Sequence, residues 1–187
     1  MNGINIYKAH EIAEELKIEI PQKFMAKVIM NKQIIKKLIS KWKRRGSNTY
    51  CGQLTSNFFL EAGYDMAPIL YGKSLWNINT TGQYGNALNS VIEGLLKEVT
   101  AEQAYYLVLV GRPSLCLSPK TMKVNNKPYN HAAITWPEWR GGYNIEKGPK
   151  IAQQGWFHLV DKYISHKYAW GKNWINPMVK YFLPGLV

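Results

Sequence analysis

Cys51 and His131 are the two residues whose types and surroundings could form a thiol nucleophile and its base. Cys51 opens a segment whose apolar residues recur at helical spacing, as far as Ala62. Unpaired N–H groups at a helix start favour negative charge and lower the pKa of a thiol there. His131 begins an apolar run that is typical of a strand, His131–Trp136. If the two side chains met, the imidazole could hold the thiolate and protonate a leaving amine.

The other histidines and the second cysteine have simpler interpretations. His10 falls in a predicted helix, and His158 and His166 fall in a polar, aromatic C-terminal region, so we expect ordinary structural roles for them. A cysteine taken alone is more often a small buried hydrophobe than a nucleophile. Neither Cys51 nor Cys116 has a neighbour at metal-ligand spacing, and a cytosolic start keeps thiols reduced. We therefore predict neither a zinc site nor a disulfide.

Helical patterns come first along the chain and strand patterns follow. Helices are predicted at His10–Leu16, Lys23–Arg45, Cys51–Ala62 and Ala87–Leu96, with a loop-like stretch over 65–83. Strands are predicted at Ala104–Val110, His131–Trp136, Lys150–Gln154 and 156–164. This order predicts an α+β domain with an antiparallel sheet. We expect one domain over 1–187, with a basic helical N-terminal lobe at 1–46 and a catalytic core at 47–187.

The chain is strongly basic, with 24 Lys plus Arg against 12 Asp plus Glu and a formal net charge of +12. Such a charge attracts polyanions, among them nucleic acid, anionic membranes and a teichoic-acid-bearing wall. Much of it lies over 32–45, where it alternates with Ile and Leu as in an amphipathic helix. We interpret this as a solvated face packed on the core, with a docking surface as the alternative. No nucleic-acid motif, secretory signal or membrane-spanning stretch is recognisable.

Several segments, taken in chain order, resemble the NlpC/P60 and CHAP superfamily of papain-like cysteine peptidases and amidases. Asn48–Gly63 is similar to the nucleophile helix, in which a cysteine opens a helix that ends in an Ala-Gly step. Asn130–Trp136 resembles the histidine strand, and Lys150–Gly155 resembles the next strand, which carries a polar residue that orients the ring. Tyr105–Val110 matches the buried strand that the family places between nucleophile and histidine. The resemblance covers about 48–156.

The resemblance implies a papain-like fold, with N-terminal helices packed on a central antiparallel sheet. It implies Cys51 as nucleophile, His131 as base, and Gln153 as the residue that accepts the Nδ1–H bond of the ring, with Gln154 as the fallback. The chain departs from the family at Asn130, where glycine is usual, at Gly52 after the cysteine, and in having glutamine where His, Asn or Glu is commoner. Tyr50, Trp136 and Trp156 are the expected substrate-binding residues.

The function so implied is hydrolysis of an amide in peptidoglycan through a thioester, as an endopeptidase or an N-acetylmuramoyl-L-alanine amidase. No metal or organic cofactor is required. We expect a monomer made without a signal peptide that reaches the wall or periplasm after holin action, lysis or injection, as a phage endolysin or a toxin does. An immunity or inhibitor protein would be a further partner, and nucleic acid would not. The alternatives are an effector that transfers acyl groups to proteins or deamidates them, and a basic, non-enzymatic module that binds nucleic acid or membrane.

Overall fold

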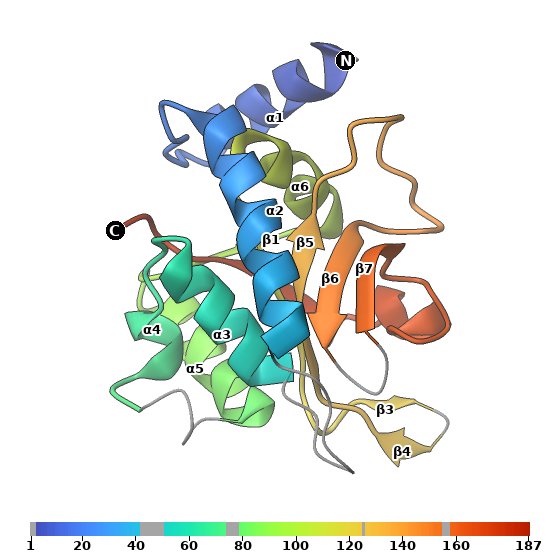
Figure 1. The fold of residues 1–187 in the computed structure, drawn as a ribbon. Coiled ribbons are helices and arrows are strands. Elements are labelled where there is room, and N and C mark those ends of the chain that lie inside the picture. Colours follow the sequence, from blue (N-terminus) through green and yellow to red (C-terminus); the bar gives the residue numbers. More distant parts are fainter. Residues whose placement is uncertain (1–2, 42–50, 74–78, 125, 155–157) are drawn as a thin grey trace.

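The computed structural model describes residues 3–41, 51–73, 79–124, 126–154 and 158–187. Within these residues the fold is α+β, with six α-helices and a six-stranded antiparallel sheet, which confirms the predicted class (Figure 1). The helices are α1 (Gly3–Glu15), α2 (Phe24–Lys41), α3 (Cys51–Glu61), α4 (Ala67–Leu70), α5 (Thr80–Ile92) and α6 (Ala101–Leu107), with short 3-10 helices η1 (Val108–Val110) and η2 (Gly171–Ile175).

The sheet has the strand order β1-β8-β2-β5-β6-β7, and every neighbouring pair is antiparallel. A separate two-stranded ribbon, β3 with β4, lies between β2 and β5 in the chain. The bounds are β1 (Lys97–Val99), β2 (Leu115–Ser118), β3 (Lys123–Val124), β4 (Lys127–Pro128), β5 (His131–Trp136), β6 (Lys150–Gln154), β7 (His158–Tyr163) and β8 (Lys180–Leu183).

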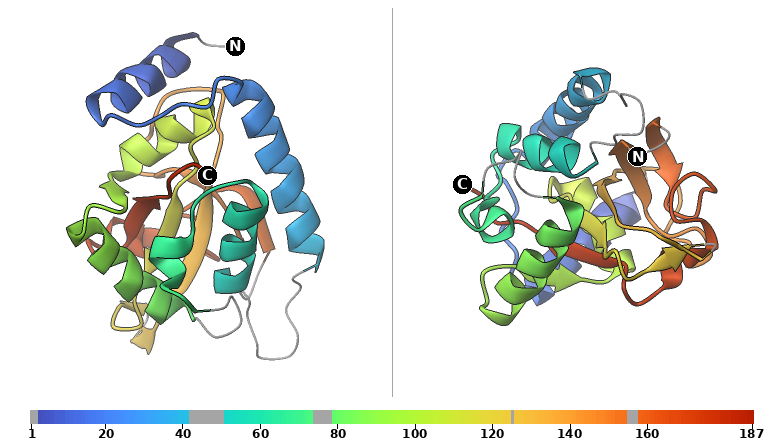
Figure 2. Two further views of the ribbon diagram at one scale, coloured as in Figure 1. Left: turned by 90° about the vertical axis from the view of Figure 1, so that its left-hand side faces the viewer. Right: turned by 90° about the horizontal axis from the view of Figure 1, so that it is seen from below.

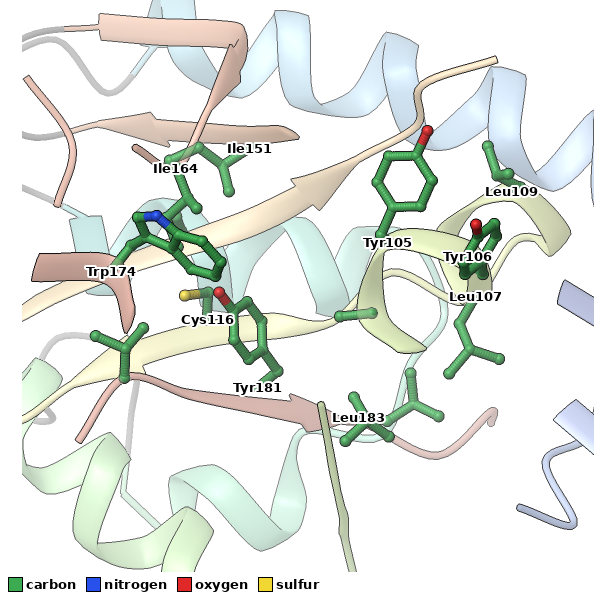
Figure 3. Close-up of a cluster of buried hydrophobic side chains, with 14 of the residues drawn as sticks. Tyr105, Tyr106, Leu107, Leu109, Cys116, Ile151, Ile164, Trp174, Tyr181 and Leu183 are labelled. Atoms are coloured by element: carbon green, nitrogen blue, oxygen red, sulfur yellow. The ribbon is translucent and has the colours of Figure 1, made fainter. Parts of the chain in front are cut away.

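The sheet has a buried core on each face because successive strand side chains point to opposite sides. On β5, Ala132 and Ile134 pack toward α2 and α3, which lie side by side (Figure 2). Ala133 faces the other core, which is shared with α1, α6 and the aromatic residues that follow β7. Figure 3 shows part of this second core. The central strands are therefore covered on both sides, and their ends are where side chains can meet a ligand.

The predicted strand at Ala104–Val110 is wrong, because this segment forms α6 and η1. A capping box starts the helix: Thr100 Oγ1 accepts the Gln103 N–H at 3.2 Å, and Gln103 Oε1 accepts the Thr100 N–H at 2.8 Å. Every residue of the segment is buried. The run therefore lacks the pattern of apolar and polar residues whose period distinguishes a helix from a strand. Four short strands, β1 to β4, lie between Cys51 and His131 in the chain, and none of them includes this segment, so the match of Tyr105–Val110 to a family strand is also wrong.

The stretch expected to be loop-like over 65–83 contains α4 and the start of α5. Asn79 caps α5, because its side-chain oxygen accepts the Gly82 N–H at 2.8 Å. Helix α5 therefore begins at Thr80, seven residues before the predicted start at Ala87. This earlier start carries the first turn of α5 to the candidate site.

The basic helix α2 packs on the core through Ile35 and Leu38, which are buried, and leaves Lys36 and Lys37 exposed. This is the arrangement expected of a solvated face, whereas Trp42, Lys43, Arg44 and Arg45 lie outside the described residues. Across the described ranges, none of the helices combines the length and the apolar character that a bilayer crossing would need.

Candidate active site

Cys51 is the first residue of α3 and is buried, with 6% of its surface exposed. Helix α3 packs across β5 and β6, and this packing brings its first turn to the beginning of β5. Three groups act on the thiol: the His131 ring, the Thr80 hydroxyl at 3.5 Å from Sγ, and the backbone amide of Ala132. All three come from other elements, α5 and β5, so the site exists only in the folded chain.

Two opposing effects set the pKa of the Cys51 thiol. Burial raises it, because a low-dielectric surrounding disfavours the thiolate. The charge of His131 and hydrogen bonds from His131, Thr80 and the Ala132 backbone lower it, and together they bring the pKa to about 7. A substantial fraction of Cys51 is therefore thiolate near neutral pH, and the thiolate is the nucleophilic form.

His131 is held at the first position of β5 and is buried, with 5% of its surface exposed. Its backbone N–H donates to Ser118 Oγ at 3.1 Å, and the Ser118 hydroxyl donates to the Tyr129 carbonyl at 3.2 Å. Its ring is bordered by Trp170, with ring centroids 4.9 Å apart, and by Tyr129, at 5.7 Å. Backbone and ring contacts together fix the imidazole at the start of β5, a strand inside the sheet.

Gln153 determines which nitrogen of the His131 ring carries the proton. Its Nε2 donates to the Tyr168 carbonyl at 2.9 Å, so its Oε1 is the atom that faces the ring, 2.8 Å from His131 Nε2. An amide oxygen can only accept, so His131 Nε2 is protonated and Nδ1 is the nitrogen left for the thiol.

The expected bond from Nδ1 to the glutamine is therefore wrong, because Gln153 bonds Nε2. Gln153 bonds Nε2 and not Nδ1 because of the position of Cys51. Its thiol is beside the backbone amide of Ala132, and Nδ1 is the ring nitrogen nearer to the backbone.

Gln154, the fallback for orienting the ring, points to the other face of the sheet. Alternation along β6 places Gln153 on the His131 side and Gln154 on the side of α3. Its side chain is fully buried, and neither amide atom has a hydrogen-bond partner among the described residues. Gln153 is thus the residue that contacts the ring.

The first turn of α5 contacts Cys51 and the residue before His131, and the sequence did not lead us to expect this. Thr80 approaches the thiol, and Thr81 Oγ1 accepts a hydrogen bond from Asn130 Nδ2 at 3.3 Å, directly before His131. The run Asn79-Thr-Thr is a typical helix start and was the available signal.

A buried hydrogen-bond network fastens α5 to α3. Gln83 Nε2 donates to the Gly52 carbonyl at 3.1 Å and to Ser56 Oγ at 2.6 Å. A Cβ at Gly52 would lie 3.1 Å from Gln83 Oε1 and 3.2 Å from Thr80 Oγ1. The glycine that follows the cysteine, a departure from the family, therefore allows α5 to approach closely.

Tyr129 and Trp170 also border the pair and were not predicted. The Tyr129 hydroxyl donates to the Ala169 carbonyl at 2.7 Å, which joins the segment before β5 to the aromatic segment after β7. Burial raises the pKa of Tyr129, and the nearby Cys51 thiolate adds to this, so Tyr129 stays neutral. The two rings give the imidazole an apolar border, which strengthens its interaction with the thiolate.

The structure does not bring the predicted substrate-binding residue Trp136 to the pair. Trp136 ends β5, five residues from His131, which is roughly 16 Å along a strand. It is buried on the opposite face, where Lys32 of α2 lies 5.5 Å from its ring centroid. Tyr50 and Trp156 lie outside the described residues.

Two of the remaining histidines occupy structural positions. His10 packs edge-to-face on Phe24, and His166 Nδ1 accepts the Tyr168 N–H at 3.3 Å. In the part of the chain that the structure describes, no group of His, Cys, Asp and Glu is arranged to hold a metal ion.

The two cysteines are both free and both buried, but their surroundings differ. Cys116 lies on β2 opposite Tyr181 of β8, inside the aromatic core drawn in Figure 3. Burial raises the pKa of Cys116 well above its ordinary value, and the nearby Tyr181 hydroxyl offsets only part of this. Cys116 is therefore an inert core residue, and Cys51 is the activated thiol.

Comparison with protein-family models, with curated proteins and with solved structures found no match.

Proposed function

We propose that this protein is a cysteine hydrolase that cleaves an amide bond of bacterial peptidoglycan, in the stem peptide or between N-acetylmuramic acid and L-alanine. The observation that carries the proposal is the chain of contacts from Cys51 through His131 to Gln153, at the start of a helix and with a thiol pKa of about 7. A merely structural cysteine gains nothing from a lowered pKa.

In the proposed reaction, the Cys51 thiolate attacks the amide carbonyl and forms a carbon–sulfur bond. The His131 imidazolium then gives its Nδ1 proton to the amide nitrogen, and the carbon–nitrogen bond breaks to release an amine. A water molecule, deprotonated by His131, attacks the thioester, releases the carboxylate and restores the pair. The backbone N–H of Cys51, at the first turn of α3, would stabilise the oxyanion.

Gln153 acts in this scheme through its effect on the ring. Its carbonyl fixes the tautomer that keeps Nδ1 toward the thiol, but a neutral amide stabilises an imidazolium less than a carboxylate would. We also propose that the fold is a papain-like member of the NlpC/P60 and CHAP type. Support comes from the order helix, histidine strand, orienting strand, with the helix and both strands in contact.

The proposed substrate rests on the resemblance and on the charge. A net charge of +12 would concentrate the protein at an anionic wall, where an endolysin or an injected toxin acts. Acyl transfer or deamidation of a protein would use the same pair with another acceptor.

The decisive experiment is the release of amino groups and soluble fragments from purified peptidoglycan under reducing conditions. The proposal predicts release by the wild type and loss of release in Cys51→Ala and His131→Ala, with both folds intact by circular dichroism. Cys116→Ala is the matched control and should stay active. Release by Cys51→Ala would end the cysteine-hydrolase proposal, and fragment masses would identify the bond.

A further inference from the structure

A basic hollow lies at the opposite end of the sheet from the Cys51–His131 pair. It has a volume of about 230 Å³, and its walls come from the segment after α1, the turn between α5 and β1, and the C-terminal residues after β8. Arg112 is one of its lining residues, with Lys17 and Lys97. Arg112 precedes β2 at the Leu115 end, whereas His131 pairs with Ser118 at the other end, so roughly 10 Å of strand separates the two regions.

Arg112 is a buried cation that forms no ion pair with any residue the structure describes. Only 4% of its surface is exposed, and Nη2 donates to the Pro184 carbonyl at 2.6 Å. Among the described residues, Nε and Nη1 have no hydrogen-bond partner. A guanidinium keeps its charge in proteins, and a buried charge that lacks a counter-charge is strongly unfavourable.

The neighbours of Arg112 add positive charge. Burial lowers the pKa of Lys27, and the charge of Arg112 lowers it further, which indicates that the two cations repel each other across the Tyr64 ring. Lys17 and Lys97 are exposed, and the Lys97 ammonium donates to the Leu16 carbonyl. Glu19 also lines the hollow, but it is exposed. Its charge affects the pKa of Arg112 less than burial and Tyr64 do.

We propose that this hollow binds a small oxyanion, a phosphate or a carboxylate group, over Arg112 and between Lys17 and Lys97. The oxyanion supplies the counter-charge that the buried guanidinium lacks, and the low dielectric around Arg112 makes that pairing strong. Because the segment after α1, β1 and the C-terminal residues all border the hollow, the anion joins segments far apart in the sequence.

The test is thermal unfolding of the purified protein in inorganic phosphate, in acetate, and in sodium chloride at matched ionic strength. Phosphate is expected to raise Tm above the chloride control, by roughly 5–10 °C at a hundredfold excess over Kd. Acetate distinguishes a site for any oxyanion from one that requires phosphate. Cys51→Ala should respond as the wild type does, which separates this site from the proposed hydrolase activity.

Arg112→Met is the decisive variant because a structural arginine and an anion-binding arginine give opposite results. We expect the Tm without phosphate to be unchanged or higher, since the unpaired charge is gone, and the response to phosphate to be lost. Should this variant fail to fold, Lys17→Met with Lys97→Met is expected to weaken phosphate binding at least tenfold, while Lys120→Met, an exposed lysine elsewhere, changes nothing. The absence of any phosphate effect beyond chloride, or an unchanged response in Arg112→Met or in the double variant, overturns the proposal.

Discussion

His131 Nε2 lies 2.8 Å from Gln153 Oε1, and the amide of Gln153 is itself fixed by the Tyr168 carbonyl. Because the Gln153 amide nitrogen donates to the Tyr168 carbonyl, only the glutamine oxygen faces the ring, and His131 Nε2 must be the donor. The imidazole therefore has one tautomer, with Nδ1 free to act on Cys51. A neutral side chain can thus orient an imidazole without supplying a counter-charge.

The neighbouring glutamines of β6 provide a matched test of this orienting role. Gln153→Leu removes the acceptor for His131 Nε2, so we expect activity on peptidoglycan to fall roughly 10- to 100-fold and stability to fall by about 2 kcal/mol. Gln154→Leu replaces a buried amide that has no partner among the described residues, so stability should be unchanged or higher and activity retained. Urea unfolding and peptidoglycan release measure the two effects.

Equal losses in both variants would mean that Gln153 has only a packing role. A pH profile sharpens the distinction, because a positioning residue alters the ionisation of the Cys51–His131 pair and a packing residue does not.

The pKa of Cys51 predicts how its reactivity depends on pH. Alkylation by iodoacetamide requires the thiolate, so the rate should rise with pH around a midpoint of about 7. In His131→Ala the lowering effects of the imidazole are lost and the effect of burial remains, so the midpoint should rise by more than one pH unit. Mass spectrometry locates the label. A wild-type midpoint near 8.5, the ordinary value of a cysteine, would contradict the predicted ion pair.

Thr80 is expected to support the thiolate through its hydroxyl. Thr80→Val keeps the shape and removes the donor, so the alkylation midpoint of Cys51 should rise by roughly one pH unit, the equivalent of one hydrogen bond to a charged group. Thr80→Ser keeps the hydroxyl and should restore the wild-type midpoint. Thr81→Val, on the next residue, is the control that should leave it unchanged. A midpoint that does not move in Thr80→Val would show that the hydroxyl contributes nothing.

A substitution at Gly148 tests the packing of the aromatic core on the face of the sheet that Ala133 faces. Its φ is +67°, and a Cβ there would lie 2.6 Å from Ile164 Cγ2 and 3.0 Å from the Trp174 ring. Gly141 has a similar φ of +83° but open space around it. Both alanine variants carry the backbone strain, and Gly148→Ala should lose about 1–3 kcal/mol more from overpacking. Equal Tm values for the two variants would contradict this packing.

Local sequence signals were sufficient where a residue's role depends on its own segment. The bounds of β5 and β6 and the helix start at Cys51 could be predicted because turn residues and apolar patterns mark them. The run Ala104–Val110 could not, because a fully buried segment is apolar on every side and its period carries no information. The cap that makes it a helix lies just outside the run, at Thr100.

The sequence by itself determined the α+β class, the strong positive charge, and Cys51, His131 and Gln153 as the residues to examine. Tertiary structure alone decided which of two buried cysteines meets an imidazole and which ring nitrogen Gln153 contacts. It also decided that Thr80 contacts the Cys51 thiol and that Arg112 is buried with two guanidinium nitrogens unpaired among the described residues. The physical reason is that pKa values and hydrogen-bond partners depend on atoms a few ångströms away in space. For Cys51 those atoms belong to residues 29, 80 and 81 positions further along the chain.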